Sequence, residues 1–120
     1  MTDTYSEEIV QFKKFVIEQL LKSRDANIEY KLCFDYIHNY KNENYRNLMT
    51  NKSGKSALDL YKEATTFLSK TNNWIYNQLA SMSKEDRAQL INEPKEMSNF
   101  IEKIHDVIKE NHDGIFLLRT

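Results

Sequence analysis

Glycine, proline and cysteine are scarce in this chain of 120 residues, which contains two glycines, one proline and one cysteine. Tight β-turns depend on glycine and similar turn residues, so their scarcity disfavours an antiparallel β fold, whereas helices do not require them. The single cysteine, Cys33, excludes an internal disulfide and fits a reducing compartment.

Long apolar runs are also missing. The longest run of apolar side chains is about four residues, whereas a membrane-spanning helix needs about 18. Charged residues at positions 7, 8, 13, 14 and 18 interrupt the N-terminal segment, so we identify no apolar core of a signal peptide. These observations predict a soluble, cytoplasmic protein that does not contact membranes.

Neither sign of charge is in excess. The chain has 17 basic and 18 acidic side chains, a net charge of −1. Proteins that bind nucleic acids usually carry a basic excess, because phosphate contacts dominate their affinity. We therefore rank nucleic-acid binding below protein binding.

Asn, Lys, Ile, Tyr and Phe are abundant, a bias that is typical of AT-rich genomes such as those of low-GC bacteria and phages.

Apolar side chains instead recur every three or four positions through most of the chain, which predicts amphipathic helices. Three expected helix starts carry a capping pattern, in which a Ser or Thr precedes an acidic residue by three positions. The predicted helices cover residues 4–23, 26–40, 56–82, 83–91 and 94–113. Within the third of these, the polar sequence KTNN at 70–73 is either a break or a polar patch on one long helix.

These elements predict an all-α fold: a single domain, residues 1–120, that forms a bundle of five or six helices. We expect a four-helix core with short accessory helices, since helices of this length gain most of their stability by packing an apolar face. The chain ends in IFLLRT, and we expect its apolar side chains to dock on the bundle or to reach a second copy in a homo-oligomer.

No catalytic, cofactor or metal motif stands out. His105 and His112 are seven positions apart, too far along a helix to hold one metal ion without other ligands. Cys33 lies among apolar residues, which is typical of a buried structural thiol. We therefore expect a protein that is not an enzyme, with no cofactor, although a site assembled from His38, Cys33 and His105 stays an alternative.

Residues 34–56 are the best candidate surface, because they combine aromatic rings, amides and cations. Tyr and Arg are favoured at binding hot spots, while the same mixture can stack on single-stranded bases. We expect helix to about residue 40, one short helical turn near 45–49, and a polar connection that includes NKSGK at 51–55. The candidate partner-binding residues are Tyr36, His38, Tyr40, Lys41, Asn44, Tyr45, Arg46 and Asn47.

The preferred hypothesis is a small non-enzymatic protein-interaction module, such as an immunity protein, an antitoxin or a phage-type inhibitor that blocks a partner protein. This choice is an analogy of size and fold class. The first alternative is a nucleic-acid-binding helical regulator, which requires Lys41, Arg46, Lys52 and Lys55 to lie on one face. The other interpretation is that Tyr36 and Tyr40 border the core and that the rest of residues 34–56 is a polar loop.

Overall fold

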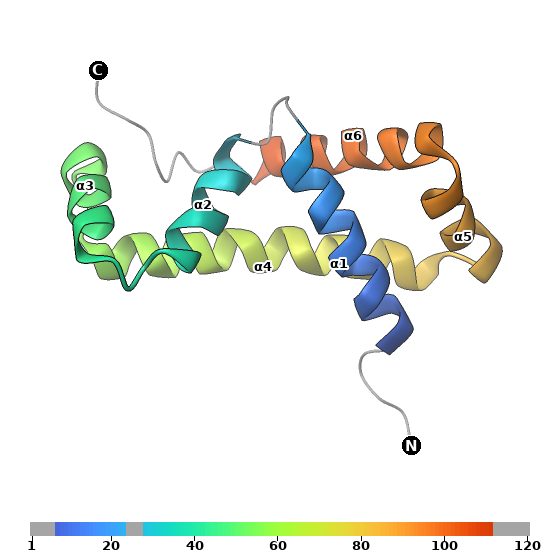
Figure 1. Cartoon of the computed structure of the whole chain (residues 1–120), viewed down its shortest axis with the longest axis horizontal. Coiled ribbons are helices and arrows are strands. Elements are labelled where there is room, and N and C mark those ends of the chain that lie inside the picture. The colour runs from blue at the N-terminus through green and yellow to red at the C-terminus, as the bar shows by residue number, and fades with distance from the viewer. Residues whose placement is uncertain (1–6, 24–27, 112–120) are drawn as a thin grey trace.

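The computed structural model describes residues 7–23 and 28–111 of the chain. This part of the chain is all-α, which confirms the predicted fold class (Figure 1). Its six helices are α1 (Glu7–Lys22), α2 (Ile28–His38), α3 (Glu43–Ser53), α4 (Ala57–Ser81), α5 (Lys84–Asn92) and α6 (Pro94–Glu110). The predicted start at Thr4, the predicted helix end at Asp113–Gly114 and the docking of the terminal IFLL lie outside the described residues.

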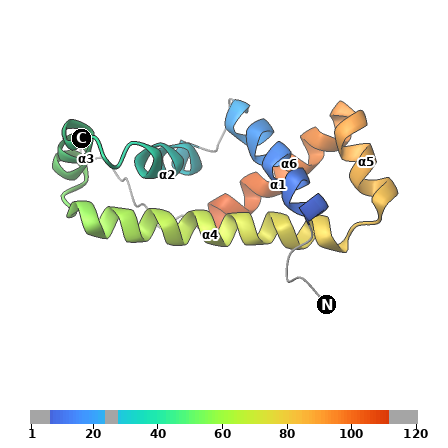
Figure 2. The same ribbon diagram turned by 60° about the horizontal axis from the view of Figure 1, so that its bottom comes forward.

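The 25-residue helix α4 organises the fold. At a rise of 1.5 Å per residue it is about 38 Å long. In Figures 1 and 2, α3 and α2 lie along its N-terminal half, while α1 crosses its C-terminal half near α6. Helices α3 (11 residues) and α5 (9 residues) stand at opposite ends of α4, in the positions of accessory helices.

The KTNN sequence at 70–73 lies inside α4 and does not break it. Thr71 is fully buried, and the side-chain oxygen of Asn72 accepts a hydrogen bond of 2.7 Å from the Tyr30 hydroxyl of α2. Burial raises the pKa of Tyr30 well above its ordinary value, and the Asn72 contact opposes part of that effect. Asn72 therefore contributes to the contact between α2 and α4.

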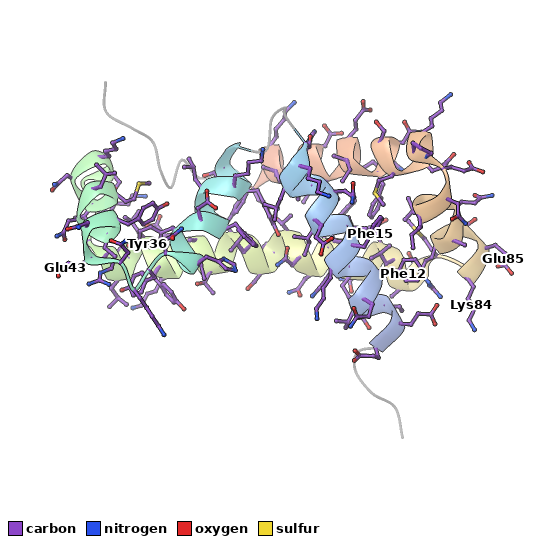
Figure 3. The ribbon with its side chains drawn as sticks, in the orientation of Figure 1. Phe12, Phe15, Tyr36, Glu43, Lys84 and Glu85 are labelled. Carbon is purple, nitrogen blue, oxygen red and sulfur yellow. The ribbon has the colours of Figure 1, made fainter. Side chains whose placement is uncertain are left out.

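The hydrophobic core lies between α4 and the helices that pack on it. The apolar residues predicted to line the last helix are buried: Met97, Phe100, Ile101, Ile104 and Ile108. Trp74 of α4 stacks on Phe100, with the two ring centroids 5.9 Å apart. Figure 3 shows Phe12 and Phe15 on the side of α1 that faces α5 and α6. In α6 the helix-period pattern of the sequence thus identifies the buried face correctly.

Two predicted helix starts are confirmed by their hydrogen bonds. The Ser56 hydroxyl accepts from the Asp59 backbone N–H at 3.1 Å, and the Ser83 hydroxyl accepts from that of Asp86 at 3.1 Å. Such side-chain caps satisfy backbone donors that have no partner within the helix. Pro94, at the first position of α6, lacks the N–H that would otherwise need such a partner.

Arg87 joins α5 to the end of α4, a contact that the sequence patterns do not reveal. Its side chain is only 8% exposed, and Nη1 donates to the carbonyl oxygens of Leu79 (2.8 Å) and Met82 (2.7 Å). Its guanidinium also lies 6.0 Å from the ring centroid of Phe12 in α1. A cation at this position suits the partial negative charge of a helix C-terminus.

No helix in the described ranges is both long enough and apolar enough to span a membrane. The cytoplasmic location stays a prediction.

Candidate partner-binding surface

Residues 43–53 form an 11-residue helix, α3, so the expectation of a polar connection with one helical turn is wrong. The helix is stabilised at both ends. Asn42 Oδ1 accepts from the Tyr45 backbone N–H at 3.0 Å, and Gly54 ends the helix in the left-handed conformation at φ 74°. The Gly54 N–H donates to the Thr50 carbonyl at 2.8 Å. These caps compensate for the small number of apolar side chains.

A tyrosine cluster, formed by Tyr36, Tyr40, Tyr45 and Tyr61, joins α2 and α3 to α4. The Tyr40 ring lies 5.6 Å from Tyr36 and 4.6 Å from Tyr61, and the Tyr36 ring lies 6.0 Å from Tyr45 (centroid distances). Aromatic pairs at these separations contribute attraction beyond the area they bury. The cluster therefore links α3 to α2 through Tyr45 and Tyr36, and links the turn before α3 to α4 through Tyr40 and Tyr61.

Tyr36 is fully buried, which corrects its assignment to the partner-binding surface. Its side chain extends from α2 toward α3 (Figure 3), and its hydroxyl donates to the Ala57 carbonyl at 3.0 Å. Burial raises the pKa of Tyr36 above its ordinary value of 10.0, and the neighbouring Tyr40 adds to that rise. Burial and the charge of Asp35 also raise the pKa of Tyr45. Tyr36 is thus a core residue that packs beneath the surface and contacts Tyr45 of α3.

Arg46 is turned toward its own chain. Its guanidinium lies 5.3 Å from the Tyr40 ring centroid, and its Nη1 donates to the Tyr40 carbonyl. Lys55 pairs with Glu63, with Nζ and Oε1 2.9 Å apart. Arg46 and Lys52 are six positions apart on α3, which separates them by about 120° around the helix axis. The shared basic face required by the nucleic-acid hypothesis is not supported.

The other predicted surface residues differ in accessibility. His38 is exposed, stacks on Phe34 at 4.0 Å between ring centroids and has its Nδ1 2.8 Å from the Phe34 carbonyl oxygen. Tyr40, Tyr45 and Arg46 are half-buried at the edge of the tyrosine cluster. Lys41, Asn44 and Asn47 are exposed. The accessible part of the predicted surface is thus mainly the outer side of α3 and the turn before it.

The sequence patterns missed two residues of that outer side, Leu48 and Asn51. Leu48 is 49% exposed and Asn51 is exposed as well. Together with Asn44 and Asn47 they recur at i, i+3, i+4 and i+7, the spacing of one helix face. We call Asn44, Asn47, Leu48 and Asn51 the amide stripe. Its spacing could have been found in the sequence, had residues 43–53 been recognised as a helix.

Cys33 is fully buried, and burial together with the charge of Glu63 raises its pKa to about 12. The thiol is therefore protonated at neutral pH, whereas the thiolate is the nucleophile. His105 Nε2 lies 3.5 Å from the Ser23 hydroxyl. Among the residues that the structure describes, no three His, Cys, Asp or Glu side chains are grouped to hold a metal ion. His112 lies outside them.

The sequence matches no protein-family model, and neither a curated protein nor a solved structure resembles the chain at a significant level.

Proposed function

We propose that the protein is a non-enzymatic helical interaction module that binds a partner protein through its α3 end. One observation carries this proposal: α3 is capped at both ends and held against α4 by the tyrosine cluster, while Asn44, Asn47, Leu48 and Asn51 stay exposed. The end of the molecule is thus a capped helix with an accessible outer face.

A helix that is already formed in the free protein supports binding, because less conformational entropy is lost on association. A loop of the same composition would have to become ordered in the complex, at a cost in affinity. Here the aromatic contacts of Tyr40 and the inward cation of Arg46 maintain the orientation of α3 in the free protein. This arrangement fits a partner-blocking role such as that of an immunity protein, an antitoxin or an inhibitor.

The proposal is tested by affinity purification from the source cell, followed by mass spectrometry and size-exclusion chromatography. We expect the wild-type chain to recover a protein partner in stoichiometric amounts. We expect Asn47→Arg, on the outer side of α3, to lose it, because a long charged side chain prevents close contact. Asn77→Arg is the matched control, since Asn77 is an exposed residue of α4. A monomeric protein that recovers no partner would contradict the proposal.

A further inference from the structure

We propose that the amide stripe of α3 is the contact face, and that the partner protein offers it an uncharged, concave surface rich in hydrogen-bonding groups, with one apolar recess for Leu48. This inference rests on the proposed function and specifies the partner's chemistry. Four observations lead to it: the alignment of the stripe, its unused amides, its lack of charge and its place in the molecule.

The alignment follows from helix geometry. Asn44 and Asn51 are seven positions apart, which is about two turns and about 10 Å along the axis, and Asn47 and Leu48 lie between them. The opposite side of α3 faces the protein, where Met49 is buried and Ser53 is half-buried. The stripe is therefore one continuous outer face. It has the i, i+3, i+4 and i+7 spacing by which helices bind in grooves of other proteins.

The three asparagines have no role in the described fold. None of their side chains forms a hydrogen bond, ion pair or ring contact within residues 7–23 and 28–111. Asparagine is also a poorer helix former than alanine, lysine or glutamate, so three of them on an exposed face weaken α3. Each carboxamide offers two N–H donors and an oxygen acceptor. A partner that pairs with these groups would explain a sequence that is unfavourable for the helix itself.

The stripe carries no charge. Exposed Glu43 in the first turn and exposed Lys52 in the last turn, which have opposite charges, border the stripe, and Arg46 is turned inward. A charged partner surface would lose its hydration against neutral amides without gaining an opposite charge. The complementary surface is therefore uncharged, and binding should depend little on salt. A nucleic acid would instead show a steep salt dependence.

The shape of the partner follows from the place of α3. The helix stands at one end of the molecule, beside the N-terminal half of α4 (Figures 1 and 2), so its outer face is convex. A convex helix buries more of its surface in a groove than on a flat surface. Leu48, 49% exposed in the middle of the stripe, is its one apolar side chain and requires an apolar recess.

Site-specific crosslinking tests which face is in contact. The photoreactive residue p-benzoylphenylalanine replaces Leu48 in one sample and, as a matched control, Ile91 of α5, which is 46% exposed, in another. Both samples are irradiated in lysate of the source cell. We expect a discrete protein adduct from position 48 and not from position 91. An adduct of twice the chain's mass, an adduct removed by nuclease, or no adduct at position 48 would overturn the inference.

Affinity measurements with the crosslinked partner, once purified, then test the chemistry. Asn44→Ala, Asn47→Ala and Asn51→Ala are combined in one variant, and Asn73→Ala with Asn77→Ala on α4 is the matched control. We expect the loss of three amides to weaken binding by about tenfold or more, and we expect the control variant to bind as tightly as the wild type. The stripe variant should fold at least as stably as the wild type, because alanine favours helix.

Salt dependence completes the test. Between 50 mM and 500 mM salt we expect less than about a threefold change in affinity, and a fall of more than tenfold would overturn the uncharged contact. Equal losses in the stripe and control variants would also overturn the inference. A partner recovered by affinity purification that does not react at position 48 contradicts only this inference. Recovery of no partner at all contradicts the proposed function as well.

Discussion

Arg87 shows how much a single side chain can contribute to this fold. Its guanidinium is buried where three helices meet: α5 supplies the residue, α4 the carbonyl acceptors and α1 the ring of Phe12. Hydrogen bonds from a charged donor contribute more than neutral ones, and burial excludes the water that would compete for the carbonyls. Arg87 should therefore be more important for stability than any exposed charge of the chain.

We expect Arg87→Met to lower the free energy of unfolding by about 1–3 kcal/mol, because methionine can fill much of the space but cannot donate to Leu79 and Met82. Arg87→Lys should have an intermediate effect, since an ammonium group lacks the planar fork of donors. Urea denaturation measures both. Lys84→Met, at an exposed position, is the control and should change stability by less than about 0.5 kcal/mol.

Buried tyrosines make the fold sensitive to alkaline pH. The pKa values of Tyr30, Tyr36 and Tyr45 are raised above 10.0 in the folded protein, mainly by burial. Well below pH 10 these tyrosines are protonated in both the folded and the unfolded states, so their contribution to stability is complete. As pH rises above 10, the unfolded state releases its protons first, and the free energy of unfolding falls.

The measurement is urea denaturation at pH 8 and at pH 11, with phenolate absorbance followed in the native protein. Tyr36→Phe should reduce the fall between the two pH values, and at pH 8 it should cost about 1 kcal/mol through loss of the hydrogen bond to Ala57. Stability that is equal at both pH values would contradict the expected role of the buried hydroxyls.

At the scale of the secondary-structure element, α3 depends on its terminal residues. Gly54 ends α3 with φ 74°, a conformation that a residue with a Cβ atom adopts at a cost. We expect Gly54→Ala to lower the free energy of unfolding by about 1 kcal/mol, and Gly54→Asn by less, since asparagine tolerates this region better. Asn77→Ala, near the C-terminal end of α4, should instead raise the free energy of unfolding, because alanine is the better helix former. Thermal denaturation compares the three variants.

The same helix shows where sequence patterns are sufficient and where they are not. The core of α6 is predicted correctly because Met97, Ile101, Ile104 and Ile108 repeat at helical spacing and are all buried. In α3 only Met49 is buried, so the apolar period is too weak to indicate a helix. The residues that indicate a helix here are its caps, Asn42 at the N-terminus and Gly54 at the C-terminus.

Tertiary contacts explain the remaining differences, because a local pattern does not specify a distant neighbour. The KTNN sequence is compatible with both a break and a helix until Asn72 is seen to meet the Tyr30 hydroxyl. Half of the eight candidate surface residues are exposed, and Tyr36 is buried because α3 and α4 enclose it. The packing of α3 on the rest of the protein also decides which of its sides faces solvent, and this places Leu48 and Asn51 on the accessible face.

At the scale of the whole molecule, stability should be uneven along the chain. α4 contributes seven buried residues and α3 only one. Regions with few buried contacts open locally at a lower free energy than the core. We expect backbone amides of α3 to exchange with deuterium at a lower opening free energy than those in the middle of α4, as measured by native-state hydrogen exchange. Equal opening free energies would mean that α3 unfolds only together with the rest of the protein.

The continuous helix α4 has a practical consequence. Because it is one uninterrupted helix of 25 residues, it acts as a stiff spacer between the ends of the molecule. Figure 3 shows Glu43 at one end, and Lys84 and Glu85 at the other. A biotin group or a sensor surface attached at Lys84 would therefore leave the opposite end facing solution. The protein can be immobilised in a defined orientation without obstructing the helix that begins at Glu43.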